Sequence, residues 1–200
     1  KLYIVDAIKK IYQYNPNVSY EFLYKSLNKD NNAIKESVAF IFGELGKEEF
    51  IKYLCNLLDL RNLEVRKNAI IALGKIGSTE PLEDLLRIIK DNTAYWLIKK
   101  VAVDAIYNIF QNNWHKVKDN KQEITRILNK KIAILADYLK IQESENYKIK
   151  LSLIKLLENF GGEYVLEALM RRVNDFHRVV RIYASNAIKK IEERLELENL

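Results

Sequence analysis

The sequence predicts an all-α fold in which helical hairpins of about thirty residues stack into a right-handed α-α superhelix, an α-solenoid. Three observations predict it. An amphipathic segment recurs five times, a second amphipathic stretch lies between its copies, and the 200 residues include only 6 Gly and 2 Pro. So few glycines and prolines disfavour a turn-rich β-sandwich. The 48% of hydrophobic residues is enough apolar material for a packed core.

The recurring segment is clearest at Val65–Gly77, VRKNAIIALGKIG. Its apolar residues stand at positions 1, 5, 8, 9 and 12 of the segment. These positions share one face of an α-helix, whereas a strand, with its period of two, cannot bring them together. The segment therefore predicts the first type of helix, and its five copies are Ile34–Gly46, Val65–Gly77, Ile98–Phe110, Ile149–Gly161 and Val180–Glu192.

A second type of helix is expected between these copies. The amphipathic stretches that predict it are Val18–Asn28, Glu48–Leu60, Leu82–Lys90, Glu123–Leu139 and Tyr164–Val173. Gly46, Gly77 and Gly161 follow the first type of helix, where a left-handed C-cap is expected. A hairpin of two such helices cannot bury its apolar face alone, so neighbouring hairpins must stack.

We expect a single solenoid over residues 1–200, interrupted by the polar insertion QNNWHKVKDN at 111–120, which we expect to form a surface loop. The chain begins inside a helix of the second type, which indicates a fragment of a longer protein. The expected divisions are a partial repeat at 1–15 and repeats at about 16–46, 47–77, 78–110, 121–161 and 162–195.

The repeat resembles the HEAT-like repeat, in particular the short variant first described in phycobilisome lyases. The best match is Glu64–Asp91, EVRKNAIIALGKIGSTEPLEDLLRIIKD, with VR, then AL, then G-x-x-G, then P-L-x-x-L-L. Copies three and four depart from it, since Tyr107 and Phe110 replace the two glycines of copy three and Glu158 replaces the first in copy four. The resemblance implies an α-solenoid and is unspecific for function.

The second position of the segment is basic in all five copies. Stacked repeats would place these side chains in a row, which favours one of two roles. One is a track for phosphates or for an acidic partner. The other is an intramolecular ladder with the acidic residues near each inter-helix loop, and the resemblance implies this second role because HEAT-type families use an Asp/Arg ladder. The row consists of Lys35, Arg66, Lys99, Lys150 and Arg181.

Two further groups are candidates for binding a partner. Arginine makes bidentate contacts with carboxylates and phosphates, and Trp and Arg are frequent binding hot spots. One group is Arg171, Arg172 and Arg178 in RRVNDFHRVVR, where a solvated turn with local pairing is the alternative. The other is Trp114 with His115 in the insertion, where Trp114 could instead anchor the insertion to the core.

Catalytic and metal-binding motifs are lacking in this sequence. His115 and His177 lack the spacings that build a metal site on a helix, and His-Glu pairs like those of the iron-carrying HEAT-like hydroxylases do not occur. Cys55 is expected to be a buried, inert thiol on the apolar face of its helix. We therefore expect no enzymatic activity, no cofactor and no metal.

The function that we expect is that of a non-catalytic protein-interaction or scaffold module, in which stacked second helices and loops present a curved surface. Its partner would be a protein or another domain of the same chain, and exposed terminal repeats could pair between copies. The alternatives are a nucleic-acid-binding solenoid, similar to the HEAT-like DNA glycosylases in shape, and a chromophore-lyase subunit. The net charge of +6 is spread evenly along the chain, unlike a basic nucleic-acid-binding arm. A single Cys suits the cytoplasm.

Overall fold

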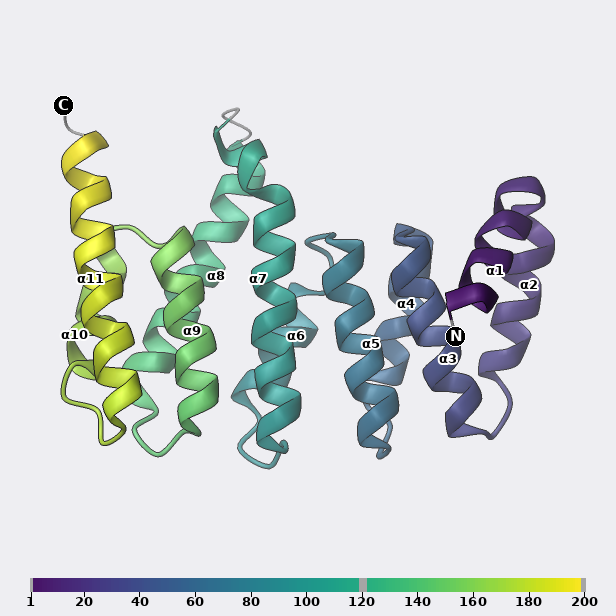
Figure 1. Ribbon diagram of the computed structural model, residues 1–200, viewed down its shortest axis with the longest axis horizontal. Coiled ribbons are helices and arrows are strands. Elements are labelled where there is room, and N and C mark those ends of the chain that lie inside the picture. The colour runs from purple at the N-terminus through teal and green to yellow at the C-terminus, as the bar shows by residue number, and fades with distance from the viewer. Residues whose placement is uncertain (1, 119–121, 199–200) are drawn as a thin grey trace. The chain divides into compact units, whose positions relative to one another are not determined.

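The computed structural model describes residues 2–118 and 122–198, and all of their regular secondary structure is helical (Figure 1). The chain divides into two compact units, residues 1–85 and 86–200. In chain order the helices pair as the sequence predicts, with a helix of the second type before each copy of the first. The all-α prediction and the repeated helical hairpin are thus confirmed.

The first unit is built from α1 to α5 and the beginning of α6. Its bounds are α1 Leu2–Tyr14, α2 Pro16–Leu27, α3 Asn32–Leu45, a 3-10 turn Glu48–Phe50, α4 Ile51–Leu57, α5 Leu63–Ile76 and α6 Leu82–Lys90. Helices α3 and α5 pack closely along their length (Figure 1). A Cβ added at Gly43 would lie 2.8 Å from the Cα of Ala72, so small residues permit this approach.

The second unit begins in α6 and contains α7 to α11. Its bounds are α7 Trp96–Lys118, α8 Gln122–Ile141, α9 Tyr147–Phe160, a 3-10 turn Glu163–Val165, α10 Leu166–Arg172 and α11 Arg178–Glu198. Helices α7, α9 and α11, which are of the first type, stand side by side in one layer, and α8 and α10 lie behind them (Figure 1). This layer of first-type helices carries the groove described below.

The predicted apolar stripe faces the core in both units. In α5, Val65, Ala69, Ala72 and Leu73 are almost completely buried, and in α11 the matching Val180, Ala184 and Ala187 are buried in the same way. Helices α3, α5 and α9 are each preceded by a capping asparagine, whose side-chain oxygen accepts a hydrogen bond from a backbone N–H of the first turn. Such caps satisfy donors that have no partner within the helix.

Two of the three predicted glycine caps have the expected conformation, and the third does not. Gly46 and Gly77 lie in the left-handed region, with φ of 66° and 76°. Gly161 has φ −82° and ψ 156°, which is extended backbone, so the prediction was wrong there. A glycine is needed at this position for space instead, because a Cβ would lie 2.6 Å from both the Leu157 carbonyl oxygen and a methyl group of Val165.

The prediction of a surface loop at 111–120 was also wrong. Helix α7 continues to Lys118, and residues 119–121 lie outside the described part of the chain. Asn113 is 3% exposed, and its Nδ2 donates to the Ile109 carbonyl at 2.7 Å. The rings of Trp114 and Phe160 are 5.0 Å apart, centroid to centroid. These contacts stabilise two further turns of helix in a sequence that reads as polar.

Cys55 is half-buried, not buried as the sequence suggested. The buried side chains of its helix are Ile51, Leu54 and Leu57. Cys55 follows Leu54 directly, so its side chain points about a quarter-turn away from the face that this residue occupies.

Candidate functional site

Asp175 lies in a buried network after the end of α10, where several cationic side chains contact it. Its Oδ2 lies 2.7 Å from Nζ of Lys150 and 3.2 Å from Nη1 of Arg172, and all three side chains are less than 5% exposed. Arg181 donates to the Asp175 backbone carbonyl at 2.9 Å. Two of the five residues of the basic row therefore converge on one acidic loop residue.

Lys99 occupies the corresponding place one repeat earlier. Its Nζ lies 3.0 Å from Oε2 of Glu145 and 3.2 Å from the Tyr138 hydroxyl, which itself donates to the same carboxylate. The side chains of Lys99 and Glu145 are 6% and 11% exposed. Lys99 thus bridges α7 to the loop before α9, as an intramolecular contact.

Hydrogen bonds dominate the electrostatics of both networks. Burial alone would raise the pKa of Glu145, but hydrogen bonds from Tyr138 and Lys99 lower it below its usual value. The pKa of Asp175 is lowered in the same way, mainly by Lys150 against the opposing effect of burial. Burial, reinforced by Glu145, raises the pKa of Tyr138. Both carboxylates are therefore held ionised in the folded protein.

The two basic-row residues of the first unit are less tightly held. Lys35 lies 4.0 Å from Asp30, whose side chain is fully exposed. Such a pair contributes little to stability. Nε of Arg66 is buried and has no hydrogen-bond partner among the described residues. The basic row is therefore uneven, with its strongest pairs at Lys99 and Lys150.

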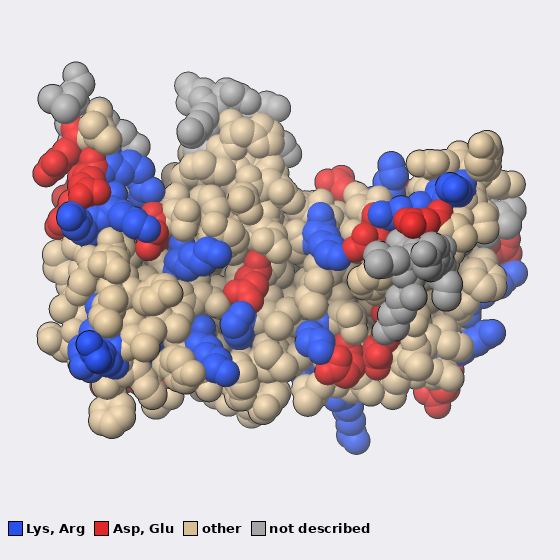
Figure 2. All heavy atoms as spheres, viewed as in Figure 1, with Lys and Arg blue, Asp and Glu red and all other residues tan. Residues whose placement is uncertain are grey.

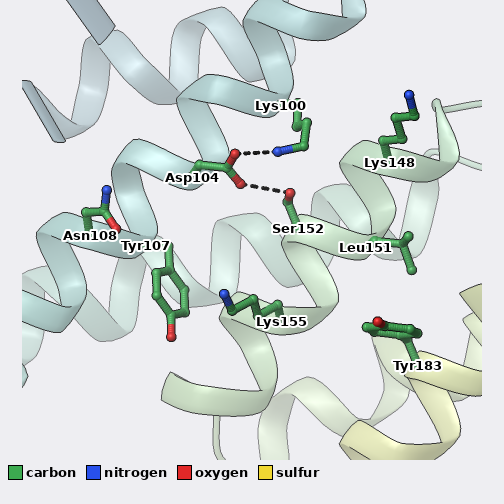
Figure 3. A pocket seen from close by; sticks show the side chains of 9 residues that line it. All are labelled: Lys100, Asp104, Tyr107, Asn108, Lys148, Leu151, Ser152, Lys155 and Tyr183. Atoms are coloured by element: carbon green, nitrogen blue, oxygen red, sulfur yellow. Dashed lines mark hydrogen bonds and ion pairs between the residues drawn. The ribbon is translucent and has the colours of Figure 1, made fainter. Parts of the chain in front are cut away.

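A groove of about 430 Å³ lies across α7, α9 and α11, on the layer of first-type helices (Figure 3). We call it the lysine groove, and it is lined by Lys100, Asp104, Tyr107, Asn108, Lys148, Leu151, Ser152, Lys155 and Tyr183. In Figure 2 basic groups surround an acidic one in the middle of this face. The sequence predicts the binding surface on the second type of helix instead, whereas this groove lies on the first type.

Three lysines of the lysine groove differ in their pairing. Lys100 lies 2.5 Å from Asp104, which also accepts a hydrogen bond from Ser152 at 2.8 Å. Lys148 and Lys155 are exposed, and within residues 2–118 and 122–198 neither has a carboxylate oxygen within 4.0 Å. Their ammonium groups lie over aromatic rings instead, Lys148 4.8 Å from the Trp96 centroid and Lys155 4.7 Å from that of Tyr107.

The predicted partner-binding arginines separate into two kinds. Arg172 is 4% exposed and belongs to the Asp175 network, which corrects the expectation that it contacts a partner. Arg171 and Arg178 are exposed. Phe176, in the loop between them, is 94% exposed and is the most exposed large hydrophobic residue of the described chain.

The other two candidates lie at the far end of α7. Trp114 is half-buried and packs on Phe160 of α9, as the alternative interpretation of this residue expected. His115, next to it, is exposed. The structure does not bring Trp114 and His115 together with Arg171 and Arg178, because the two groups lie at opposite ends of the first-type helices (Figure 1).

Lys148 was missed in the sequence because it falls one residue before the recurring segment. Lys155 lies inside the recurring segment, at a position that is not basic in the other four copies. The signal that identifies both is their spacing with Leu151, at i, i+3 and i+7, which places all three on one face of α9.

In the part of the chain that the structure describes, no group of three or more His, Cys, Asp or Glu residues could hold a metal ion. None of the described helices combines the length and the apolar character that crossing a membrane requires.

Comparison with known proteins identifies the repeat. Residues 20–106 match the family model described as HEAT repeats. The helical hairpins within residues 20–106 therefore match HEAT repeats, as the sequence resemblance predicted, although the match does not specify the phycobilisome-lyase variant.

Among solved structures, the chain is similar to human deoxyhypusine hydroxylase in complex with glycerol, with a TM-score of 0.44 and 14% sequence identity. This similarity covers 94% of the present chain and 88% of the other. A search of curated proteins finds no match.

Proposed function

We propose that this chain is a non-catalytic protein-interaction module that binds a partner through the layer formed by α7, α9 and α11. HEAT repeats support the general role of a scaffold, because stacked helices offer an extended surface on rigid elements. The observation that carries the proposal is the lysine groove, where the ammonium groups of Lys148 and Lys155, without a carboxylate partner among the described residues, stand beside the half-buried Leu151 and the exposed Tyr183.

The loop between α10 and α11 supports the same proposal. It carries the exposed Phe176 between Arg171 and Arg178, and an exposed aromatic residue with arginines nearby is typical of interface hot spots. The α10–α11 loop and the lysine groove share α11, which lines the groove through Tyr183 and begins at Arg178. A partner lying along α11 would contact both.

The proposal is tested by affinity capture with the whole chain as bait, after nuclease treatment, followed by mass spectrometry and titration of the captured protein. We expect a protein whose binding saturates and which is lost with the Arg171→Ala, Arg178→Ala double variant. Lys130→Ala, an exposed residue of α8, is the control that should retain it. The double variant should melt at the wild-type temperature, because both arginines are exposed.

Two results would contradict the proposal. One is that no protein is retained above the level of an unrelated bait. The other is that the retained material is nucleic acid, removed by nuclease, with an affinity that falls steeply as salt rises.

A further inference from the structure

Lys148, Leu151 and Lys155 give the lysine groove a regular pattern along α9. The two lysines are seven residues apart, so they leave α9 on nearly the same side, separated by about 10 Å of helix rise. Leu151 lies between them on the same face, and Tyr183 of α11 stands across from it (Figure 3). The lysine groove therefore alternates a cation, an apolar patch and a second cation.

The aromatic rings beneath the lysines matter for what the lysine groove can bind. A ring under an ammonium group attracts it without accepting its hydrogen bonds in the way that a carboxylate does. The N–H groups of Lys148 and Lys155 are therefore left to donate to a ligand, whereas those of Lys100 are directed to Asp104 at 2.5 Å. Two cations remain uncompensated, so charge complementarity favours an anionic ligand.

The spacing suits an extended peptide. A chain in the polyproline II conformation advances about 3.1 Å per residue and has three residues per turn. Acidic residues three positions apart therefore lie on one side of such a chain, about 9 Å from each other. This distance is close to the separation of the two lysines along α9.

We infer that the lysine groove binds an extended acidic segment of a partner protein, in which two carboxylates three residues apart contact Lys148 and Lys155 and an apolar side chain between them packs on Leu151 and Tyr183. This inference rests on the proposed function and names the ligand class of its surface. A nucleic acid fits less well, because Asp104 places a carboxylate inside the lysine groove and two free cations would neutralise only about two phosphates.

The test is fluorescence anisotropy with the whole chain and a fluorescein-labelled peptide containing Glu-Pro-Leu-Glu between Gly-Ser flanks. We expect saturable binding that weakens at least about tenfold when both Glu are replaced by Gln, because two charge-assisted contacts are lost. Replacing Leu by Ala should weaken it about threefold to tenfold.

The protein variants separate the lysine groove from general charge attraction. Lys148→Gln with Lys155→Gln should weaken peptide binding at least about tenfold. Lys130→Gln with Lys189→Gln removes the same charge from exposed positions on α8 and α11 and should leave the affinity within about twofold of wild type. Equal weakening by both pairs would overturn the inference, as would no peptide binding at all.

A single-stranded oligonucleotide of similar length is the competing probe. If it bound more tightly than the peptide and depended on the same two lysines, the acidic-peptide inference would be overturned. Failure of the inference is distinguishable from failure of the proposed function. A captured protein that still binds the Lys148→Gln, Lys155→Gln variant would refute the lysine groove as its site and leave the protein-binding function standing.

Discussion

Lys148 and Lys150 are two residues apart on α9, and they lie in opposite environments. The side chain of Lys150 is 3% exposed and its ammonium group lies 2.7 Å from Asp175. Lys148 is exposed over the Trp96 ring, and no described carboxylate lies within ion-pair distance. Two residues turn a helix by about 200°, so neighbouring lysines face opposite sides. One helix therefore carries both a buried, paired cation and an exposed cation without a carboxylate partner among the described residues.

Removal of the acidic partner of Lys150 should produce the largest effect. Asp175→Ala leaves the buried Lys150 and Arg172 without their carboxylate, and breaking a buried pair in this way costs about 3–5 kcal/mol. We expect the free energy of unfolding, measured by urea denaturation, to fall by that amount. The exposed Asp137→Ala is the matched control and should change it by less than about 0.5 kcal/mol. Equal effects would remove the distinction between the two kinds of lysine.

Acid should weaken the two buried networks at Asp175 and Glu145. The pKa of Asp175 and that of Glu145 are lower in the folded chain than in the unfolded one, so the folded state binds fewer protons as the pH falls. Their stabilisation is present above about pH 5 and is lost as the pH falls through the folded pKa values. Urea denaturation between pH 7 and pH 3 should show this decline.

A control variant makes the pH measurement specific. The decline should be shallower in Asp175→Asn, which has no carboxyl group to titrate at this position. An unchanged slope in that variant would show that Asp175 does not carry the effect.

The Tyr138 hydroxyl should have a smaller effect. It donates to Glu145 and lies 3.2 Å from Lys99, so Tyr138→Phe removes one bridging group but leaves the ion pair. We expect a loss of about 1 kcal/mol in the free energy of unfolding. Tyr95→Phe, at a ring that is 49% exposed, provides the comparison and should be neutral. A neutral Tyr138→Phe would mean that the network does not depend on its hydroxyl.

Much of the fold could be predicted because helical periodicity is local. The stretch Leu82–Lys90 was predicted with the bounds that α6 has, and the stripe Val65, Ala69, Ala72 and Leu73 is buried as expected. The continuation of α7 could not be predicted, because the contact of Trp114 with Phe160 joins residues far apart in the sequence.

The site was harder to predict for the same reason. Arg171 and Arg172 are adjacent residues of the same type, so the sequence alone does not distinguish them. In the structure Arg172 is buried against Asp175, while Arg171 is exposed. Lys148 and Lys155 are recognised as a pair only when α9 is placed beside α7, whose Trp96 and Tyr107 lie beneath them. The sequence predicts which face of a helix a residue occupies, but it does not predict which other helix packs against that face.

The most direct test of the central claim combines stability and binding in the Lys148→Gln, Lys155→Gln variant. If the paired cations hold the fold and the unpaired cations bind the partner, its free energy of unfolding should stay within about 0.5 kcal/mol of wild type. Its affinity for the Glu-Pro-Leu-Glu peptide should fall at least about tenfold. A variant that unfolds more easily but binds the peptide as wild type does would contradict the account.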